Sequence, residues 1–546
     1  MEIYNLSLRN WAIIIIAVLI LSFLIFAFFK IKNIIAKIFF AVIILGSIYF
    51  AGTKINNYTY LLIYWIAPSF IFGFITYLCS IPKKRDDLWD IKIDTNKGDR
   101  FIDNVKRGVA VFGAAGAGKT ESVIFKILKH FAFQNFGGII YDFKKGELTE
   151  IAIPLFKERL KTIACFDPQI GSRINVIHPR YIRGEKDINQ ITTVLMDNLI
   201  DNGVGKGNDF FKDAGSALFS ATVLKFWLYH KEYCTLPHVI SFLLSADFGE
   251  DVEDNLGQES FEQFAKLKKF LTDDDRVSIQ ASPFLLGLAS SRQTASVIST
   301  LANGLRKLSF PEMYWTLSGD DLDLNINDKK NNSVISVLNE PDSSDVLSPI
   351  NALIIHMITK QMMKRDRLPS FLVLDEAPTI RLLNMAQLPA TMRSFGVAVV
   401  YCAQDIVQGN VKYGREGFLE IISNLSTQFF GKSNSPVTSQ FYESYFELVK
   451  EKTKSVSRKG EFGNGFSFGD DSVTIGEREV SKVRAQEFRG FKPGTFAFIS
   501  DEINEVIRIR PDKIVRERIS RKKEITDAVV FANYQRIMKE AQSIIR

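Results

Sequence analysis

The chain has 546 residues, of which 46% are hydrophobic, and its formal net charge at pH 7 is +7. The first 82 residues contain five basic residues and one acidic residue, which leaves the rest of the chain with a net charge of only +3. A charge this small excludes a broadly basic surface that wraps duplex DNA, so contacts with nucleic acid would come from a few local Lys and Arg side chains. The four cysteines are far apart, which suits a reducing cytoplasm and argues against a disulfide framework or a zinc site.

Three apolar runs near the N-terminus predict a transmembrane anchor. Residues 11–29 and 60–81 are uncharged and long enough to cross a bilayer core, whereas the middle run, 38–52, is short. Basic residues gather at 30–37 and 83–85, and cytoplasmic loops carry the excess of Lys and Arg. Three spans therefore put the remainder of the chain in the cytoplasm. A version with two spans, in which the middle run does not cross, remains an alternative.

The segment after the anchor is typical of an α/β domain. Residues 83–107 are polar and predict a linker, and a buried strand is expected at 109–112. A helix should follow over 121–130, and further strands are expected at 138–142 and 162–166. Strands that alternate with helices predict a parallel sheet, whose ligands bind at the carboxyl ends of the strands.

Helical spacing of apolar residues replaces this alternation between about 185 and 305 and predicts an all-α insertion. Its helices are expected at 188–202, 209–229, 236–244, 260–271 and 294–308. Later strands are expected at 333–339, 370–374, 397–402, 495–499 and 505–509. Residues 453–478 are rich in Ser, Gly, Lys and Asp and predict a surface loop or hairpin. The tail from Arg516 is typical of a charged helix that extends from the core.

A phosphate-binding loop lies between the first predicted strand and the helix after it. The sequence GAAGAGKT matches the pattern GxxxxGK[ST], and its residues are Gly113, Ala114, Ala115, Gly116, Ala117, Gly118, Lys119 and Thr120. Glycines let the backbone N–H groups approach phosphates closely. Lys119 should reach the β and γ phosphates of ATP, and the Thr120 hydroxyl should hold Mg²⁺. The strand–loop–helix context favours this interpretation over a glycine-rich turn without a ligand.

A second motif supplies acidic residues. The run FLVLDE at 371–376 is four apolar residues followed by two acids. Asp375 is expected to hold Mg²⁺ through water, next to the phosphate loop, and Glu376 to polarise the attacking water. Many strands end on acidic residues, so the position of this strand after a phosphate loop is what favours a functional role.

Other polar residues flank the predicted strands. Gln404 follows a strand and is expected to bond the γ-phosphate or the lytic water, with capping of an ordinary loop as the alternative. Arg393 precedes that strand, and in a ring it could reach a neighbouring subunit's nucleotide as an arginine finger, or else form a surface salt bridge. Arg107 is a weaker candidate. Asp142 and Lys144 end another strand, where a site role and a helix-capping role for Asp142 remain open.

Taken in order, these motifs resemble the coupling proteins of conjugative type IV secretion systems, the TraD/TraG family. The resemblance covers about residues 85–510 and rests on the segments 113–120, 141–148, 291–301, 374–378 and 393–396 with Gln404, after a membrane anchor. It implies an α/β fold with a RecA-like P-loop NTPase domain, an inserted all-α domain and an N-terminal transmembrane helical anchor. The predicted domains are an anchor at 1–82, a nucleotide-binding domain at 83–184 and 306–515, an all-α domain at 185–305, and a charged C-terminal helix or tail at 516–546.

The same resemblance implies a homo-hexamer in the bacterial inner membrane, with its ATPase domain in the cytoplasm. The implied function is ATP hydrolysis that drives relaxase-bound DNA into a type IV secretion channel. In that function Lys119, Glu376, Gln404 and Arg393 would be catalytic, with ATP and Mg²⁺ bound. The implied partners are single-stranded or relaxosome DNA, the relaxase, channel ATPases, inner-membrane components and membrane lipid. A receptor that delivers protein effectors, and for which ATP binding serves assembly, is the alternative.

Overall fold

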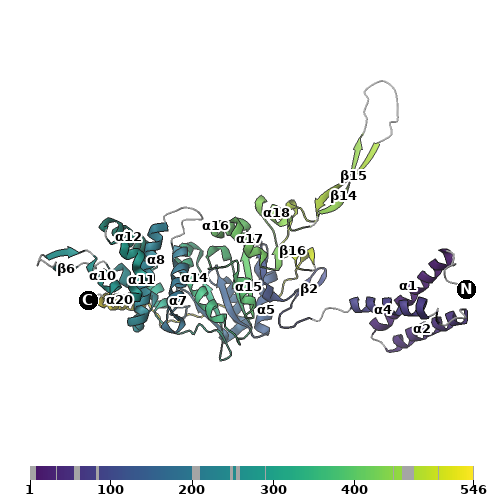
Figure 1. Cartoon of the computed structure of the whole chain (residues 1–546), viewed down its shortest axis with the longest axis horizontal. Coiled ribbons are helices and arrows are strands. Elements are labelled where there is room, and N and C mark those ends of the chain that lie inside the picture. Colours follow the sequence, from purple (N-terminus) through teal and green to yellow (C-terminus); the bar gives the residue numbers. More distant parts are fainter. Residues whose placement is uncertain are drawn as a thin grey trace, which may run out of the picture. The chain divides into compact units, whose positions relative to one another are not determined.

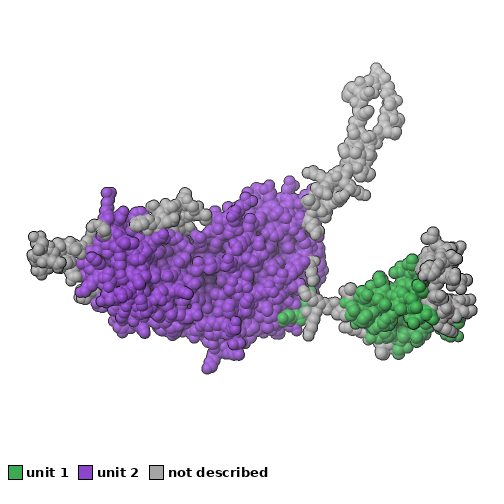
Figure 2. All heavy atoms as spheres, in the orientation of Figure 1, with its two compact units in different colours: residues 1–86 green, residues 87–546 purple. Residues whose placement is uncertain are grey.

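The structure is a computed structural model that describes residues 8–31, 34–54, 59, 62–80, 85–199, 209–245, 250–253, 259–262, 264–288, 290–446, 448–457, 472–501 and 503–544. The chain divides into two compact units, Met1–Asp86 and Asp87–Arg546, which Figure 2 colours separately.

The first unit is helical. Its elements are α1 (Leu8–Lys30), α2 (Ile34–Lys54), the π-helix η2 (Leu62–Ile66) and α4 (Ala67–Ser80). Helix α1 packs against α2 and α4, and its contact with α4 contains small residues together with Leu21, Ile25 and the ring of Phe29. Ser22 and Ser69 are buried there, and a β-carbon at Gly73 would lie 2.7 Å from the Ser22 carbonyl oxygen. Within the described residues, no helix combines the length and the hydropathy that a membrane span needs. The transmembrane anchor therefore stays a prediction.

A mixed sheet is the frame of the second unit (Figure 1). Among the described residues it has nine strands, in the order β17-β16-β13-β3-β12-β11-β4-β10-β5. In chain order these are β3 (Val109–Phe112), β4 (Gly137–Asp142), β5 (Leu160–Ile163), β10 (Val334–Leu338), β11 (Ser370–Leu374), β12 (Val397–Ala403), β13 (Thr427–Phe430), β16 (Thr495–Ile499) and β17 (Asn504–Arg508). Neighbours are parallel except at one edge, where β16 runs antiparallel to β13 and to β17.

Most of these strands lie where the apolar pattern predicts them, with two differences. Strand β5 ends at Ile163, so it starts and stops earlier than the predicted 162–166. Strand β13 has no counterpart in the prediction, because two of its four residues, Thr427 and Gln428, are polar although they are buried, so its sequence contains no apolar run of strand length.

Both faces of the sheet are covered, as the alternation of side chains along β3 shows. Val109 and Val111 belong to one apolar core, and Ala110 and Phe112 belong to the other. The helices of the sheet region are η4 (Lys119–Ile124, a π-helix), α5 (Phe125–Phe133), α6 (Glu147–Phe156), α14 (Ser344–Met362), α15 (Leu388–Arg393), α16 (Ile406–Tyr413), α17 (Arg415–Ser423), α18 (Pro436–Glu443) and α19 (Ala485–Gly490). Because neither face meets water there, the inner strands β3, β10, β11 and β12 are nearly continuous apolar runs.

The segment predicted as a linker is instead partly a hairpin. Strands β1 (Ile91–Thr95) and β2 (Gly98–Ile102) pair antiparallel, and Thr95 bridges to Ile509 beyond β17. Three isoleucines of this hairpin, at 91, 93 and 102, are buried in the same core as α5. The linker prediction was wrong because polar residues dominate the composition, while the buried residues occupy only every second position of β1.

A helical region follows β5 along the chain and lies at one end of the second unit (Figure 1). Its helices are α7 (Glu185–Leu199), α8 (Asp209–Tyr229), α9 (Leu236–Leu244), α10 (Ala265–Thr272), α11 (Asp275–Gly287), α12 (Ser291–Arg306) and α13 (Pro311–Leu317). The sequence prediction missed α11 and α13. The start of α11 is capped by Asp274, which accepts hydrogen bonds from the N–H groups of Arg276 and Val277. A short hairpin, β6 (Glu250–Glu253) with β7 (Glu259–Glu262), interrupts the helices. The predicted domain boundaries stay predictions.

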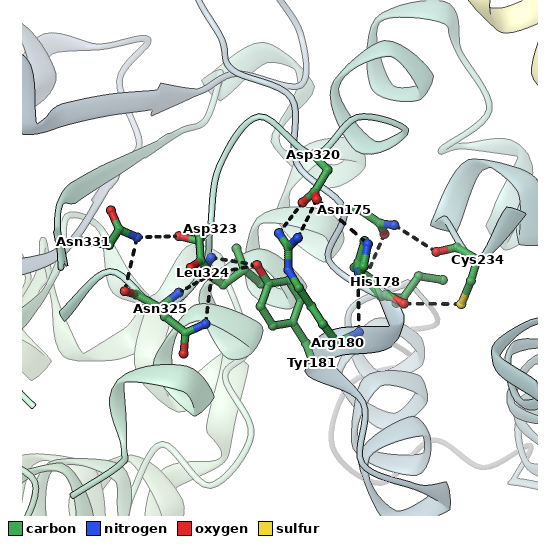
Figure 3. Close-up of polar contacts among 11 residues, drawn as sticks. Asn175, His178, Arg180, Tyr181, Cys234, Asp320, Asp323, Leu324, Asn325 and Asn331 are labelled. Carbon is green, nitrogen blue, oxygen red and sulfur yellow. Dashed lines mark hydrogen bonds and ion pairs between the residues drawn. The ribbon is translucent and has the colours of Figure 1, made fainter. Parts of the chain in front are cut away.

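The two connections between the sheet and the helical region are fastened to each other (Figure 3). The guanidinium of Arg180 donates two hydrogen bonds to the Asp320 carboxylate, at 2.7 and 2.5 Å. The buried Tyr181 hydroxyl donates to Asp323 and accepts from the Leu324 N–H, both at 3.0 Å. Hydrogen bonds therefore hold the segment that enters the helical region, at 180–181, against the segment that leaves it, at 320–324; these two segments are here called the joint.

The C-terminal segment differs from its prediction. The helix begins at Asp527 rather than near Arg516, and α20 (Asp527–Ser543) packs against α9 and α13 instead of extending from the core. Residues 510–526, here called the strap, have no helix or strand and run from the sheet to the helical region. Charged residues of the strap form ion pairs with the sheet region. The helix prediction was wrong here because it used only the local sequence, which does not contain these distant partners.

The predicted surface loop or hairpin at 453–478 overlaps a pair of strands. Strands β14 (Leu448–Ser457) and β15 (Ser472–Ser481) form an antiparallel hairpin. The residues between them, 458–471, lie outside the described part of the chain.

Candidate nucleotide-binding site

The phosphate loop lies where β3 ends and the helix pair η4–α5 begins. The Gly113 N–H donates to the Ala403 carbonyl at 3.2 Å, and the Ala114 N–H donates to the Lys432 carbonyl at 2.8 Å. These bonds hold the loop against the ends of β12 and β13, the strands on either side of β3. The loop is therefore fixed by residues that are 290 and 318 positions away in sequence.

Two glycines give the loop its path. Gly116 and Gly118 have φ values of 75° and 84°, in the left-handed region that glycine adopts without steric cost. A β-carbon at Gly118 would also lie 2.7 Å from the Gly494 nitrogen. The helix that follows opens as a π-helix at Lys119, two residues before the predicted start.

Lys119 and Glu376 meet across the carboxyl edge of the sheet. The Lys119 ammonium lies 3.5 Å from Glu376 Oε1 and donates a hydrogen bond of 2.6 Å to the Gly113 carbonyl. Both side chains are buried. Neither oxygen of the Glu376 carboxylate accepts a hydrogen bond from the described residues. A buried carboxylate with free acceptor capacity beside a lysine is suited to orient water or a phosphate group.

The backbone of Glu376 is also unusual. Its φ and ψ are 51° and 50°, a left-handed conformation that is rare for a residue with a side chain. The short 3₁₀ turn Ala377–Thr379 begins immediately after it, and the Thr379 N–H and hydroxyl both donate to the Glu376 carbonyl. These bonds hold the residue in a conformation of the kind that clusters at functional sites.

Strand order decides how the acidic motif reaches the loop. Strand β12 lies between β3, which leads into the phosphate loop, and β11, which leads into Asp375 and Glu376. One strand therefore separates the acidic pair from the loop. Gln404 follows β12 directly, and the preceding carbonyl of Ala403 accepts from the loop at Gly113. The structure thus brings the loop, Gln404 and the acidic pair to one edge of the sheet.

Asp375 is buried among carboxylates. Burial is the main cause that raises its pKa to about 7, and the charges of Glu376 and Asp142 add to it, while Lys144 and Lys119 oppose it. Excess negative charge of this kind favours a cation. Mg²⁺ needs only one or two protein oxygens besides water and phosphate, so the Asp375 carboxylate and the Thr120 hydroxyl fit the predicted metal role.

Asp142 has the capping role that the sequence left open. Its buried carboxylate accepts from the Lys144 N–H at 3.1 Å, and from the N–H and the hydroxyl of Thr149, both at 2.7 Å. Burial raises its pKa, and the bonds from Thr149 and Lys144 oppose this. Asp142 therefore fixes the start of α6 and adds to the negative field around Asp375.

The two candidate arginines lie elsewhere. Arg393 is exposed at the end of α15 and precedes β12, whereas Gln404 follows that strand. A seven-residue strand is about 23 Å long, so Arg393 is remote from its own subunit's phosphate loop. Arg107 forms an ion pair with Asp501, so this arginine has a structural partner and needs no role in the nucleotide site.

A cavity of about 430 Å³ adjoins the phosphate loop, and sequence reasoning missed it. It is lined by Gly118, Glu121 and Ser122 from the loop and η4, by Pro493, Gly494, Arg508 and Ile509, and by Pro511, Asp512, Ile514 and Arg516 of the strap. No local motif identifies these residues, because the strap reaches the loop only through the tertiary fold.

Comparison with known proteins agrees with this geometry. A family profile described as type IV secretory system conjugative DNA transfer matches residues 82–444. The chain belongs to this family. The coupling-protein membership expected from the motifs is confirmed.

Solved structures share the fold of this conjugative transfer protein. It is similar to the unbound bacterial conjugative coupling protein TrwBdeltaN70, with a TM-score of 0.59, 14% identity, and coverage of 81% of this chain and 91% of that chain. The complex of TrwB with ADP and Mg²⁺ matches with a TM-score of 0.57 and 14% identity, over 76% of this chain and 87% of that one. The complex of TrwB with a non-hydrolysable ATP analogue matches with a TM-score of 0.56 and the same identity and coverage. No curated protein sequence matches the chain.

Proposed function

We propose that this protein is a membrane-associated ATPase that couples ATP hydrolysis to the delivery of relaxase-bound DNA into a type IV secretion channel. The observation that carries the proposal is the buried Lys119–Glu376 pair at the phosphate loop, in a chain of the conjugative DNA transfer family. The complexes of TrwB with ADP, Mg²⁺ and an ATP analogue support the choice of nucleotide.

Each residue of the site has a separate task in this proposal. The backbone N–H groups of residues 113–120 hold the phosphates, and Lys119 exchanges its bond to the Gly113 carbonyl for bonds to the β and γ phosphates. Glu376 then loses its cationic partner and orients the attacking water. Gln404 bonds the γ-phosphate or that water. Thr120 and, through water, Asp375 would hold Mg²⁺, which would supply positive charge to the β and γ phosphates.

Arg393 has a role only if a second copy supplies it. Its distance from its own phosphate loop fits an arginine finger that acts on the neighbouring subunit of a ring. A homo-hexamer with RecA-like motor domains meets this need, and the helical region is then the all-α domain of such a motor. Single-stranded DNA, the relaxase and the channel components are the proposed partners.

The first unit supports the association with a membrane. Large apolar side chains on α1 and α4, such as Phe23, Ile71 and Phe72, are exposed, whereas Ser22 and Ser69 are buried between these helices. So many exposed apolar side chains are unlike the surface of a water-soluble bundle, and small residues at helix contacts are typical of helices that pack in lipid. Retention of the full chain in alkali-washed cell membranes tests this part, and release of the chain by the wash contradicts it.

The test of the motor uses the full chain in detergent micelles. We expect ATP turnover that single-stranded DNA stimulates, and we expect Lys119→Ala and Glu376→Gln to lower turnover by a factor of about 10²–10⁴. Glu376→Gln should still bind ATP, because the phosphate loop and Lys119 remain. Lys186→Ala, at an exposed lysine of α7, is the matched control and should behave as the wild type.

Conjugal transfer from donor cells completes the test. Loss of transfer in Lys119→Ala, with normal amounts of the variant in the membrane, supports the motor. Normal transfer by that variant contradicts it. ATP turnover that DNA does not stimulate, together with co-purification of a protein effector instead of the relaxase, would favour the alternative, a receptor that delivers protein effectors.

A further inference from the structure

The carboxylate of Glu376 has no hydrogen bond of its own that fixes where it points. Neither of its oxygens accepts a hydrogen bond within the part of the chain that the structure describes, and the ammonium of Lys119 lies 3.5 Å away. In the proposed function Lys119 turns to the phosphates, so it does not hold the carboxylate during hydrolysis. The direction of this side chain therefore depends on the backbone of Glu376.

That backbone is held by Thr379. The Thr379 N–H donates to the Glu376 carbonyl at 3.0 Å, and the Thr379 hydroxyl donates to the same oxygen at 2.7 Å. Glu376 has φ and ψ of 51° and 50°. This left-handed conformation is strained for a residue with a side chain, so it persists only where the surroundings impose it. The two bonds from Thr379 impose it here.

Two further side chains support Thr379. The Tyr141 hydroxyl lies 2.8 Å from Thr379 Oγ1, and Asn339 Nδ2 donates to the Tyr141 hydroxyl at 2.7 Å. A hydroxyl has one proton, and Thr379 gives its proton to the Glu376 carbonyl, so Tyr141 is the donor to Thr379. The bonds therefore run in one direction and end on Glu376. Asn339, Tyr141 and Thr379 are here called the support network.

The support network is anchored in the sheet. Tyr141 of β4 and Asn339, which follows β10, are both buried. Tyr141 lies opposite Leu374 of β11, and its carbonyl accepts a hydrogen bond of 3.0 Å from the Asp375 N–H. Burial raises the pKa of Tyr141, so its hydroxyl keeps the proton that it donates. The ends of three neighbouring strands thus hold the turn after Glu376 in place.

We propose that Thr379 and Tyr141 are positioning residues for ATP hydrolysis, which act by fixing the backbone of Glu376 so that its carboxylate is aimed at the attacking water. This inference rests on the proposed function, in which Glu376 orients that water. The phosphate loop is held by bonds to the Ala403 and Lys432 carbonyls and not by the support network. Loss of either hydroxyl should therefore slow hydrolysis and leave the affinity for ATP unchanged.

Single-turnover hydrolysis of Mg²⁺–ATP by the full chain in detergent, with the protein in excess and no DNA, measures the step concerned. Thr379→Val keeps the shape of the side chain without its hydroxyl and should lower the rate roughly tenfold. Thr379→Ser restores the hydroxyl and should restore most of the rate. Tyr141→Phe should have a smaller effect, because the Thr379 hydroxyl keeps its bond to Glu376. Calorimetric titration with Mg²⁺–ATP should give the wild-type affinity for all three variants.

A matched control removes a hydroxyl elsewhere. Thr272 of α10 is exposed, and its hydroxyl donates to the Lys268 carbonyl at 2.9 Å. Thr272→Val therefore removes the same kind of bond from the helical region. It should leave both the rate and the ATP affinity unchanged.

The Glu376→Gln background separates positioning from a general structural defect. If Thr379 acts through the carboxylate, Thr379→Val should slow the Glu376→Gln protein no further, so the two losses do not add. The same fractional loss in both backgrounds overturns the inference. Thermal unfolding establishes which variants are folded, and if Thr379→Val is not, Tyr141→Phe is compared in the same two backgrounds.

The remaining outcomes distinguish this inference from the proposed function. A wild-type rate in Thr379→Val overturns the positioning role and leaves the proposed function standing. A weaker ATP affinity in that variant with an unchanged rate at saturating ATP also overturns it, because the hydroxyl would then serve binding. If the wild type does not hydrolyse ATP at all, the proposed function itself fails.

Discussion

Lys119 and Glu376 form a buried ion pair 3.5 Å apart, although 256 residues separate them in sequence. Their side chains are 8% and 2% exposed. An ion pair this deeply buried stabilises the folded protein little more than a pair of apolar side chains would, but loss of one partner leaves an uncompensated charge in the interior. The pair is therefore a weak source of stability and a strong constraint on both residues.

We expect Lys119→Ala to lower the free energy of unfolding of the nucleotide-free protein by about 3–5 kcal/mol. The double variant Lys119→Ala/Glu376→Gln should recover part of this loss, because the remaining side chain is neutral. Denaturant unfolding of the four proteins of this cycle measures the coupling. Additive effects of the two single changes would contradict the ion pair.

The stability of the nucleotide-free protein should also depend on Asp375. Burial raises the pKa of this carboxyl group from 3.8 to about 7. Between these two values the folded protein holds a proton that the unfolded chain releases, so stability falls as the pH rises through this window. Asp375→Asn removes the effect. The variant should melt at a higher temperature than the wild type at pH 8, with a smaller difference at pH 5, in thermal scans without Mg²⁺. A difference that is the same at both pH values would contradict the shifted pKa.

Gly118→Ala should impair the phosphate loop more than Gly116→Ala. Both positions have positive φ, so an alanine at either is strained by about 1–2 kcal/mol. Only at Gly118 does the new β-carbon also collide with backbone, 2.7 Å from the Gly494 nitrogen, whereas no atom lies within 4 Å at Gly116. ATP affinity should therefore fall by more than tenfold further in Gly118→Ala. Equal affinities of the two variants would mean that the loop moves freely relative to Gly494.

The joint between the sheet and the helical region allows a comparison of a buried and an exposed contact (Figure 3). Tyr181→Phe leaves the buried Leu324 N–H without its acceptor and should cost about 1–3 kcal/mol of stability. Asp320→Asn removes an ion pair with Arg180 whose partners are 33% and 41% exposed, and it should cost less than about 1 kcal/mol. Urea unfolding ranks the two variants. The reverse order would show that the exposed pair, and not the tyrosine, holds the joint.

Local patterns allowed much of the site to be predicted. The phosphate loop is contiguous in sequence, and Asp375 follows an unbroken apolar run, so both could be placed on a strand end without the fold. The starts and ends of α8 and α9 were predicted correctly because their apolar residues keep helical spacing. Polar segments were predicted poorly. The hairpin β1–β2 was predicted as a linker, and residues 516–526 of the strap were predicted as part of a helix, since the conformation of both segments depends on contacts with distant residues.

The sequence by itself determined which chemical groups this protein brings to a nucleotide, because those groups are specified by residue type and short spacing. Only the tertiary structure decided that β12 separates the strand of the phosphate loop from the strand of Asp375, so that Gln404 lies between them. It also decided that Arg393 is remote from its own loop and that the strap forms a cavity beside Gly118. The physical reason is that strand order and the path of a polar segment follow from burial and pairing between residues far apart in the chain, which no local window of sequence contains.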